Sequence, residues 1–315
     1  MGDYSLWEIV QLLYYISLVW GVTNTADWLV ILFETIQHWL FPSSEIILGE
    51  SWDRPVSVHL PFLYHASKAY PLIVIIHAYS VNGPYQNTYF NLHQGARFGG
   101  YVLFYPTGLV DSDGKNYWTA TDACCDLDKR NYDDAGYIKS LIEEVQTKVN
   151  IDADRIFLVG HSNGAFMSYR MACQYPELLA GIVTLAGTSF YDNSVCTALG
   201  DAAERKLSIL QITGTQDKIN GGDILTVPFP SVSQTVSDWQ SNLGCTASTL
   251  AYQRDIDIEM LLPGKETKVY KTADGTCPDG IDITRWDIID GKHIPILGLK
   301  FPHYVFEWID AHTRP

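Results

Sequence analysis

Positive charge is scarce in this sequence of 315 residues, in which 21 Lys and Arg residues face 36 Asp and Glu residues and the formal net charge is −15. A nucleic-acid partner needs cationic side chains that neutralise phosphates, so this balance argues against nucleic-acid binding. Long basic runs are absent as well, which argues against attachment to an anionic membrane surface. No Lys or Arg precedes Arg54, so the N-terminus matches an export signal poorly.

Metal-ligand spacings are also missing, because neither Cys-x-x-Cys nor His-x-x-x-His occurs. The sequence therefore predicts no metal site, and we expect no organic cofactor. An even number of cysteines is compatible with disulfides and with an oxidising, extracytoplasmic compartment; the six are Cys124, Cys125, Cys173, Cys196, Cys245 and Cys277. Cys173 falls inside a predicted helix, and we expect it to be a free buried thiol.

Long apolar stretches are confined to the N-terminus, at Leu6–Trp20 and Trp28–Phe41. The polar segment between them begins with Gly21, a helix-stop residue, so residues 1–44 are predicted to form a helical hairpin. Each stretch is shorter than the roughly 20 residues that span a bilayer and contains Glu and Gln, which argues against membrane insertion. A lid or cap, an arm for homo-oligomer formation, and membrane association remain as hypotheses for the hairpin.

From residue 45 to residue 315 the pattern becomes an alternation of strands and helices, which predicts one α/β catalytic domain with a mostly parallel sheet and helices on both faces. The content of 47% hydrophobic residues suffices for a large core. Predicted strands lie at 54–61, 71–76, 101–105, 155–160, 181–185, 207–213, 269–271 and 281–289. Predicted helices lie at 87–98, 133–149, 232–243 and 301–312, with another after residue 162 that ends at Pro176.

The segment Gly160-His161-Ser162-Asn163-Gly164 lies between a buried apolar strand and a helix. This is the layout of a nucleophile elbow, a sharp turn that raises one serine hydroxyl above the end of a sheet. A side chain at either glycine would block the close approach of strand and helix. We therefore predict that Ser162 is a nucleophile.

A serine nucleophile needs an imidazole base and a carboxylate, which in this type of sheet follow in the order Ser, Asp or Glu, His. The strand at 207–213 leads into Asp217, the leading candidate for the acid, with Asp192 and Asp223 as weaker alternatives. The strand at 281–289 leads into a glycine turn that carries His293, the predicted base. The alternative base is His303, at the start of the last helix.

Two backbone N–H groups are expected to bind the oxyanion that forms during acyl transfer. One belongs to Asn163, at the positive end of the helix that follows Ser162. The other is expected at Tyr79, in the loop after the strand at 71–76. Trp118 is a candidate substrate-binding wall for the acyl group, although a buried structural tryptophan is an equally good interpretation.

These residues, taken together, resemble the α/β-hydrolase esterases of the polyhydroxybutyrate-depolymerase-like and feruloyl-esterase-like group, which is close to the family-1 carbohydrate esterases. The resemblance runs from about Gly49 to the C-terminus. It rests on a set of segments that includes the strand that ends at His77, Tyr105-Pro106-Thr107-Gly108, Trp118 with Cys124-Cys125, the elbow, Gly214-Thr215-Gln216-Asp217 and Gly244-Cys245. Two positions depart from the usual pattern, namely Ala78 after His77 and the residues around His293.

The resemblance implies a triad of Ser162, Asp217 and His293, a Cys245–Cys277 disulfide, and pairing of Cys196 with Cys124 or Cys125. It also implies a serine carboxylic-ester hydrolase that acts through an acyl-enzyme on a small or polymeric ester. A polyester (polyhydroxyalkanoate) depolymerase and a feruloyl esterase are alternatives within this class. A catalytically silent binding or assembly protein is an alternative of a different class.

Overall fold

The computed structural model describes residues 46–315, apart from residues 219–222, 225–226 and 247–248. Ile47–Pro315 form one compact unit. The predicted hairpin at residues 1–44 lies outside the described residues, so both the hairpin and its boundary at residue 45 remain predictions. Within the described part of the chain, no helix combines the length and the apolar character that a membrane crossing requires.

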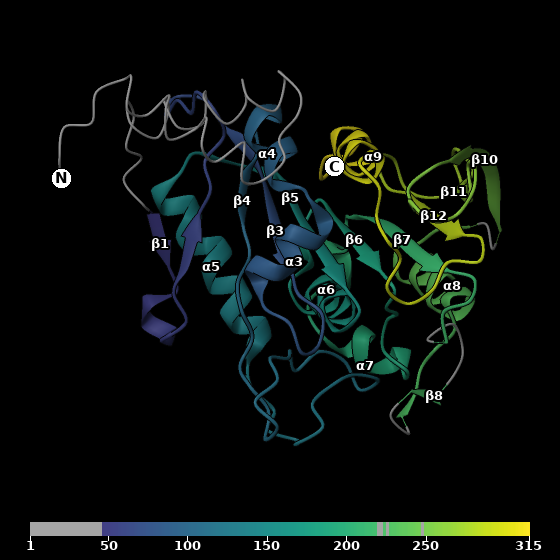
Figure 1. Ribbon diagram of the computed structural model, residues 1–315, viewed down its shortest axis with the longest axis horizontal. Helices are drawn as coiled ribbons and strands as arrows, with labels where there is room; N and C mark the ends of the chain where they lie inside the picture. Colours follow the sequence, from purple (N-terminus) through teal and green to yellow (C-terminus); the bar gives the residue numbers. More distant parts are fainter. Residues whose placement is uncertain (1–45, 219–222, 225–226, 247–248) are drawn as a thin grey trace, which may run out of the picture. The chain divides into compact units, whose positions relative to one another are not determined.

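An eight-stranded sheet forms the centre of this unit (Figure 1), in the order β10-β11-β12-β7-β6-β5-β3-β4. All neighbours from β12 to β4 are parallel, whereas β10 pairs with β11 and β11 with β12 in antiparallel fashion. The strands of this sheet are β3 (Tyr70–Ile76), β4 (Val102–Phe104), β5 (Ile151–His161), β6 (Gly181–Leu185), β7 (Ser208–Gly214), β10 (Leu250–Ile256), β11 (Thr267–Thr272) and β12 (Ile283–Ile288). Two short pairs lie outside it: β1 (Ile46–Leu48) with β2 (Val56–Val58), and β8 (Asp223–Ile224) with β9 (Val227–Pro228).

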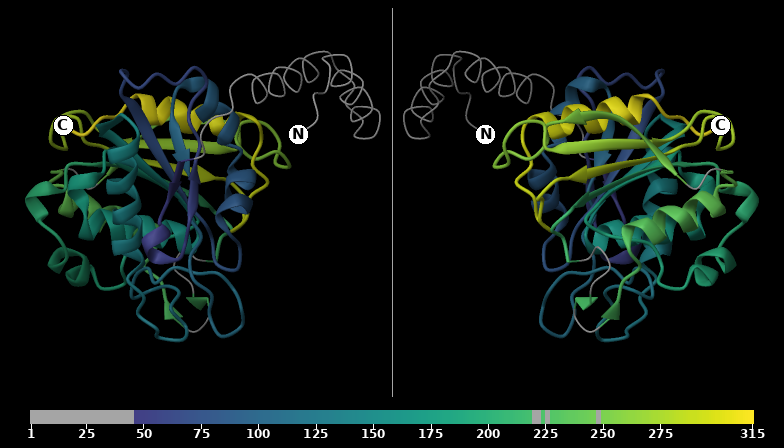
Figure 2. Two further views of the ribbon diagram at one scale, coloured as in Figure 1. Left: turned by 90° about the vertical axis from the view of Figure 1, so that its left-hand side faces the viewer. Right: turned by 90° about the vertical axis from the view of Figure 1, so that its right-hand side faces the viewer.

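Helices cover both faces of the sheet, as predicted (Figure 2). One layer consists of α3 (Gly83–Phe90), α4 (His93–Gly99) and α9 (Lys300–Asp310). The other consists of α5 (Asp134–Lys148), α6 (Asn163–Gln174), α7 (Asn193–Ala198) and α8 (Val232–Asn242). Short 3₁₀ turns occur at η1 (Glu50–Trp52), η2 (Pro176–Leu178) and η3 (Ala202–Glu204).

The central strands are buried along their whole length because both faces are covered. All positions of β3, β6 and β7 are buried, which explains their near-continuous apolar sequences. Alternate residues serve the two faces, so that Ile73 and Ile75 of β3 pack in one cluster with Phe301 and Val305 of α9. The parallel α/β prediction is confirmed.

One predicted helix differs from the structure, and several elements were not predicted, of which β10 is the longest. The predicted helix at 87–98 is two helices, because Asn91 adopts a left-handed backbone conformation (φ 52°) that ends α3. Strand β10 was missed altogether. It is an edge strand whose residues 251–254 are all exposed, so its sequence lacks the alternation of apolar and polar residues on which strand prediction depends.

All six cysteines are paired, as Cys124–Cys125, Cys173–Cys196 and Cys245–Cys277. The third pair agrees with the implied one. The prediction of a free Cys173 is wrong, and so is the pairing of Cys196 with Cys124 or Cys125. Helix α7 packs on α6 and brings the buried Cys196 to the buried Cys173, a contact between helices that sequence spacing does not reveal.

Candidate active site

Ser162 lies in the turn between β5 and α6, with a backbone φ of 51° that is rare for a residue with a side chain. Its N–H donates to the carbonyl oxygen of Leu185 in the neighbouring strand β6 (2.8 Å). Its own carbonyl oxygen accepts from the N–H groups of Ala165 and Phe166. The strained turn is thus fixed by backbone hydrogen bonds on both sides, as a nucleophile elbow requires.

The two glycines of the motif allow β5 and α6 to approach closely. A Cβ on Gly160 would lie 2.2 Å from the carbonyl oxygen of Gly164, and a Cβ on Gly164 would lie 2.1 Å from that of Ile76. Both distances are far inside van der Waals contact with backbone atoms, which cannot move aside without displacing a strand. The expected steric role of these glycines agrees with this geometry.

The structure brings Ser162, His293 and Asp217 together in one hydrogen-bonded chain. His293 Nε2 lies 3.0 Å from Ser162 Oγ, and His293 Nδ1 lies 3.0 Å from Asp217 Oδ2. The side chain of Asp217 is fully buried, whereas that of His293 is one-third exposed. With the Nδ1 proton directed at the carboxylate, Nε2 is left free to accept a proton from the serine hydroxyl.

The acid and the base reach each other because two turns pack against one another. Gly214 ends β7, and a Cβ there would lie 2.2 Å from the carbonyl oxygen of Gly291. That same carbonyl oxygen accepts from the N–H of Gln216 (2.9 Å). The turn that carries Asp217 and the loop that carries His293 are therefore held together by their backbones.

Asn163 begins α6, where backbone N–H groups of the first turn have no partner within the helix. Its side chain is fully buried and bonds both backbone groups of Trp118: Oδ1 accepts from the N–H (2.7 Å) and Nδ2 donates to the carbonyl (3.0 Å). The N–H of Tyr79 makes no hydrogen bond within the described part of the chain. Both predicted oxyanion donors are therefore unengaged in this conformation.

His77 supports the loop that carries Tyr79. It is fully buried; its Nδ1 lies 2.7 Å from the carbonyl oxygen of Ala78, and the N–H of Gly108 donates to Nε2 (2.8 Å). These partners assign a neutral ring that is protonated on Nδ1. Burial lowers the pKa of His77 to about 4, so the ring stays neutral and keeps both hydrogen bonds near neutral pH.

Trp118 differs from its predicted role as an acyl-contacting wall. The side chain has no exposed surface, its Nε1 donates to the carbonyl oxygen of His77 (3.0 Å), and its ring packs on the His77 ring. In this conformation it offers a substrate no surface. Trp118 instead joins the Tyr79 loop to Asn163, which is the alternative of a buried structural tryptophan.

The weaker candidates for acid and base lie elsewhere. The carboxylate of Asp192 accepts from the N–H of Ser194 and caps α7. Asp223 is the first residue of β8. His303 is exposed on α9, where its ring packs on Tyr304. Neither Asp192 nor His303 takes part in the chain of hydrogen bonds at Ser162.

Two residues at the site were not singled out from the sequence, His161 and Tyr89. His161 is the variable residue of the elbow motif, and its Nε2 lies 3.2 Å from the carbonyl oxygen of His293. Tyr89 stacks on the His161 ring and donates its hydroxyl to the carbonyl oxygen of Pro295 (2.8 Å). A histidine directly before a predicted nucleophile was the one available signal; nothing local distinguishes Tyr89.

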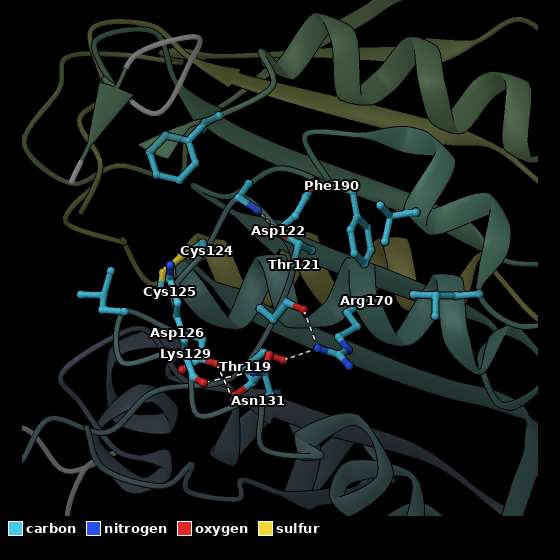
Figure 3. A pocket seen from close by; sticks show the side chains of 16 residues that line it. Thr119, Thr121, Asp122, Cys124, Cys125, Asp126, Lys129, Asn131, Arg170 and Phe190 are labelled. Carbon is cyan, nitrogen blue, oxygen red and sulfur yellow. Dashed lines mark hydrogen bonds between the residues drawn. A yellow bond between two sulfur atoms is a disulfide. The ribbon is translucent and has the colours of Figure 1, made fainter. Parts of the chain in front are cut away.

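A cavity of about 470 Å³ adjoins the first turns of α6 (Figure 3). Phe190, Phe229 and Leu199 line it together with Arg170, whose guanidinium donates to the carbonyl oxygens of Thr119 (2.8 Å) and Ala120 (3.0 Å). The lining also includes the Cys124–Cys125 pair, and Cys124 Sγ lies 3.8 Å from Asn163 Nδ2. The cavity surface is thus mainly apolar, and one of its lining residues, Cys124, contacts the side chain of Asn163.

Comparison with known proteins finds similarity to esterases. Residues 126–221, which include Ser162 and Asp217, match the phospholipase/carboxylesterase family. Feruloyl esterase B of Piromyces equi is 24% identical over 76% of this chain and 42% of its own length. Poly(3-hydroxyalkanoate) depolymerase C of Paucimonas lemoignei is 28% identical over 47% of this chain and 38% of its own length. This chain therefore spans less than half of the length of these relatives.

A solved structure confirms the fold. The acetyl xylan esterase from Aspergillus awamori superposes with a TM-score of 0.58 over 85% of this chain and 100% of its own, at 18% sequence identity. That likeness identifies the α/β-hydrolase fold.

Proposed function

We propose that this chain, an α/β-hydrolase with feruloyl esterase and polyhydroxyalkanoate depolymerase relatives, is a serine carboxylic-ester hydrolase that works through an acyl-enzyme. The observation that carries the proposal is the hydrogen-bonded chain from Asp217 through His293 to Ser162. It lies at an elbow whose backbone has the strained conformation of a nucleophile turn. We assign Ser162 as nucleophile, His293 as general base and acid, and Asp217 as the group that orients His293.

The geometry supports a two-step reaction. His293 Nε2 takes the hydroxyl proton as Ser162 Oγ attacks the ester carbonyl, and the N–H groups of Asn163 and Tyr79 bind the oxyanion. Collapse of the tetrahedral intermediate breaks the ester bond, and His293 returns the proton to the alcohol that leaves. Water then attacks the acyl-enzyme by the same route and releases the acid.

The first test is the S162A variant. Its kcat for a p-nitrophenyl ester should fall by about 10⁶-fold, while circular dichroism and the melting temperature stay close to those of the parent chain. Labelling of the parent chain by an organophosphate, located at Ser162 by mass spectrometry, separates an enzyme from a catalytically silent binding protein. Retained turnover in S162A, or an unreactive Ser162 in the parent chain, would remove the proposal.

We further propose that the cavity beside α6 accepts the larger half of the ester. Its volume of about 470 Å³ and its apolar lining with Phe190 and Phe229 suit an aromatic or branched group. Phe229 packs on Phe166, one turn after Ser162 (ring centroids 5.5 Å apart), so one wall of the cavity packs against the first turn of the helix that follows the nucleophile. This observation favours feruloyl-type or polyester substrates over the smallest esters.

A panel of esters varied separately in acyl and alcohol parts tests this assignment, with methyl ferulate and a polyhydroxyalkanoate film as the two specific candidates. F229A should change the ratio of kcat/KM between bulky and small esters by about 10-fold, which corresponds to the loss of a few apolar contacts. F98A is the control, because Phe98 is a half-exposed residue of α4 on the other face of the sheet. If F229A and F98A had the same ratio of kcat/KM between bulky and small esters, the larger half of the ester would bind outside this cavity.

Two further assignments concern the chain as a whole. We propose an extracytoplasmic location, because three disulfides persist best in an oxidising compartment. We also propose that residues 1–44 act as a lid or an oligomer arm. Deletion of residues 1–42 should then change either the elution volume in size-exclusion chromatography or the preference for acyl-chain length; no change in either would exclude both roles.

A further inference from the structure

His293 stands on a segment that has no regular secondary structure of its own. We call residues 289–299, between the end of β12 and the start of α9, the histidine loop. A displacement of about 1 Å at a catalytic group can lower a rate about 100-fold. The loop therefore needs fixed points close to His293, beyond the contact of Gly291 with the Gly214 turn.

Two such points lie on the side of the loop that faces β5 and α3. The Nε2 of His161 lies 3.2 Å from the carbonyl oxygen of His293. The hydroxyl of Tyr89 donates to the carbonyl oxygen of Pro295 (2.8 Å). The hydrogen bonds therefore hold the backbone at His293 itself and two residues beyond it.

The two side chains also hold each other. Their rings are stacked, with centroids 5.1 Å apart and planes 21° apart, and the fully buried Phe90 packs edge-on against His161. Tyr89 comes from α3 and His161 from the end of β5, so the pair is fixed by two separate elements. A stacked pair of this kind has few rotamers to lose, which suits a positioning role.

His161 also has the right protonation state for this role. Because a carbonyl oxygen can only accept, Nε2 of His161 carries the proton of a neutral ring. Burial, together with the nearby His293 ring, lowers the pKa of His161 to about 4, and the hydrogen bond to the His293 carbonyl and the charge of Asp217 only partly oppose this shift. A neutral ring 5.7 Å from the His293 ring adds no repulsion when His293 becomes positively charged during the reaction.

We propose that Tyr89 and His161 form a two-point clamp on the histidine loop that positions the His293 ring between Ser162 and Asp217. This inference rests on the proposed hydrolase function. Neither residue is a catalytic residue, since neither contacts the reacting atoms; both act through the backbone of the loop. The clamp adds a constraint that the elbow sequence alone does not supply.

Three variants test the clamp one atom group at a time. Y89F removes only the hydroxyl and keeps the stacked ring. H161F removes the ring nitrogens and keeps an aromatic ring, although that ring is somewhat larger than imidazole. H161Q restores an N–H donor at the position of Nε2. Y85F is the matched control, because Tyr85 lies on the same helix with 61% of its surface exposed.

We expect kcat to fall roughly 5-fold in Y89F and roughly 20-fold in H161F, with KM within two-fold of the parent value, because the loop is misplaced rather than the substrate. In the Y89F/H161F double variant, kcat should fall by a larger factor than the product of the two single factors, because both hydrogen bonds to the loop are then lost. H161Q should recover most of the loss, and Y85F should match the parent chain. The rate of phosphonylation of Ser162 should fall in parallel with kcat.

The clamp is overturned if Y89F and H161F keep the parent kcat and phosphonylation rate and change only the melting temperature. It is also overturned if H161Q loses as much as H161F, because the donor would then be irrelevant. Failure of the proposed function looks different: the parent chain itself would neither hydrolyse esters nor react with the organophosphate. Y89F is the most conservative change, so it serves as the measurement if H161F does not fold.

Discussion

The two halves of the candidate site are held by different means. On the nucleophile side, the backbone of Ser162 is fixed by neighbouring backbone and by the missing side chains of Gly160 and Gly164. On the base side, the loop that carries His293 is held by backbone hydrogen bonds at Gly291, Ile296 and Gly298 and, in addition, by side chains from distant parts of the chain. Those side chains include Tyr89, His161 and Glu259.

This difference predicts which kinds of substitution disrupt each side. The elbow is a local structure, and five consecutive residues carry nearly all of its geometry. The histidine loop is a tertiary structure, and Tyr89 and Pro295 are 206 positions apart in the sequence. We therefore expect steric changes to break the nucleophile side and loss of single hydrogen bonds to loosen the base side.

Among the variants that test this contrast, the largest effect should come from D217N, which removes the carboxylate that links the two sides. An amide in place of the buried carboxylate no longer favours the His293 tautomer with a proton on Nδ1, and kcat should fall roughly 10⁴-fold. D192N is the matched control, since Asp192 only caps α7, and it should stay within two-fold of the parent chain. Steady-state kinetics on one activated ester suffices. A larger loss in D192N would transfer the role of the acid to that residue.

The next largest effect should come from a substitution that creates a steric clash on the nucleophile side. In G164A the new Cβ would lie 2.1 Å from the carbonyl oxygen of Ile76, and we expect the free energy of unfolding to fall by about 3 kcal/mol. G298A is the control on the histidine loop, where the nearest atom to a new Cβ would be 3.5 Å away. Denaturant titration should show little change in G298A. Similar losses in both variants would contradict the contrast between the two sides.

The same contrast decides how much of the molecule can be predicted from its sequence. The parallel sheet, the elbow and the order of Ser162, Asp217 and His293 follow from local patterns, since each lies at the end of a buried apolar strand. The triad is a set of positions that the fold brings together, and the α/β-hydrolase order is enough to choose them. Their catalytic roles await the kinetic tests.

What the sequence did not reveal depends on contacts between distant elements. Cys173 pairs with Cys196 because α7 lies on α6, which no spacing rule indicates. Trp118 is buried against His77 instead of facing a substrate, because the loop that carries it folds back onto Asn163. Tyr89 belongs to the site only through tertiary contacts, namely the stacking of its ring on His161 and the hydrogen bond from its hydroxyl to Pro295. Each case is set by tertiary packing rather than by a local preference.

The pH dependence of stability gives a smaller effect, to which His161 contributes. The pKa of its folded form, about 4, lies below the ordinary value of 6.5. The unfolded chain therefore binds a proton first as the pH falls. The contribution of the neutral His161 to the free energy of unfolding is thus fully present above pH 6.5 and is lost as the pH falls from 6.5 to 4. Between about pH 7 and about pH 4.5 this loss amounts to about 2 kcal/mol.

H161F should lack this contribution. Its free energy of unfolding, measured by denaturant titration at both pH values, should fall less on acidification than that of the parent chain. H65F is the control, because His65 is exposed, and its pH dependence should match the parent's. If H161F showed the full dependence, the acid-induced loss would have to come from carboxylates or from His77.

The smallest effect should come from Glu259, another side chain that bonds the backbone of the histidine loop. Its buried carboxylate accepts from the N–H of Ile296 (2.9 Å) with Oε1 and from those of Leu261 and Leu262 with Oε2. E259Q replaces one acceptor oxygen by a donor that faces an N–H group. We expect the free energy of unfolding to fall by about 1 kcal/mol, and kcat to fall by no more than about two-fold, because Tyr89 and His161 still hold the loop nearer His293.

E143Q is the matched surface change, since Glu143 is half-exposed and pairs only with Lys139 one turn away, and it should be within about 0.5 kcal/mol of the parent chain. The three side chains bond the loop at increasing distance from His293 along the chain. His161 bonds the backbone of His293 itself, Tyr89 bonds the backbone of Pro295, and Glu259 bonds the backbone of Ile296. The loss of kcat should fall in that order. If a variant at Glu259 lost more kcat than H161F, the predicted order of the losses would be wrong, and the loop would be held mainly from its end nearest α9.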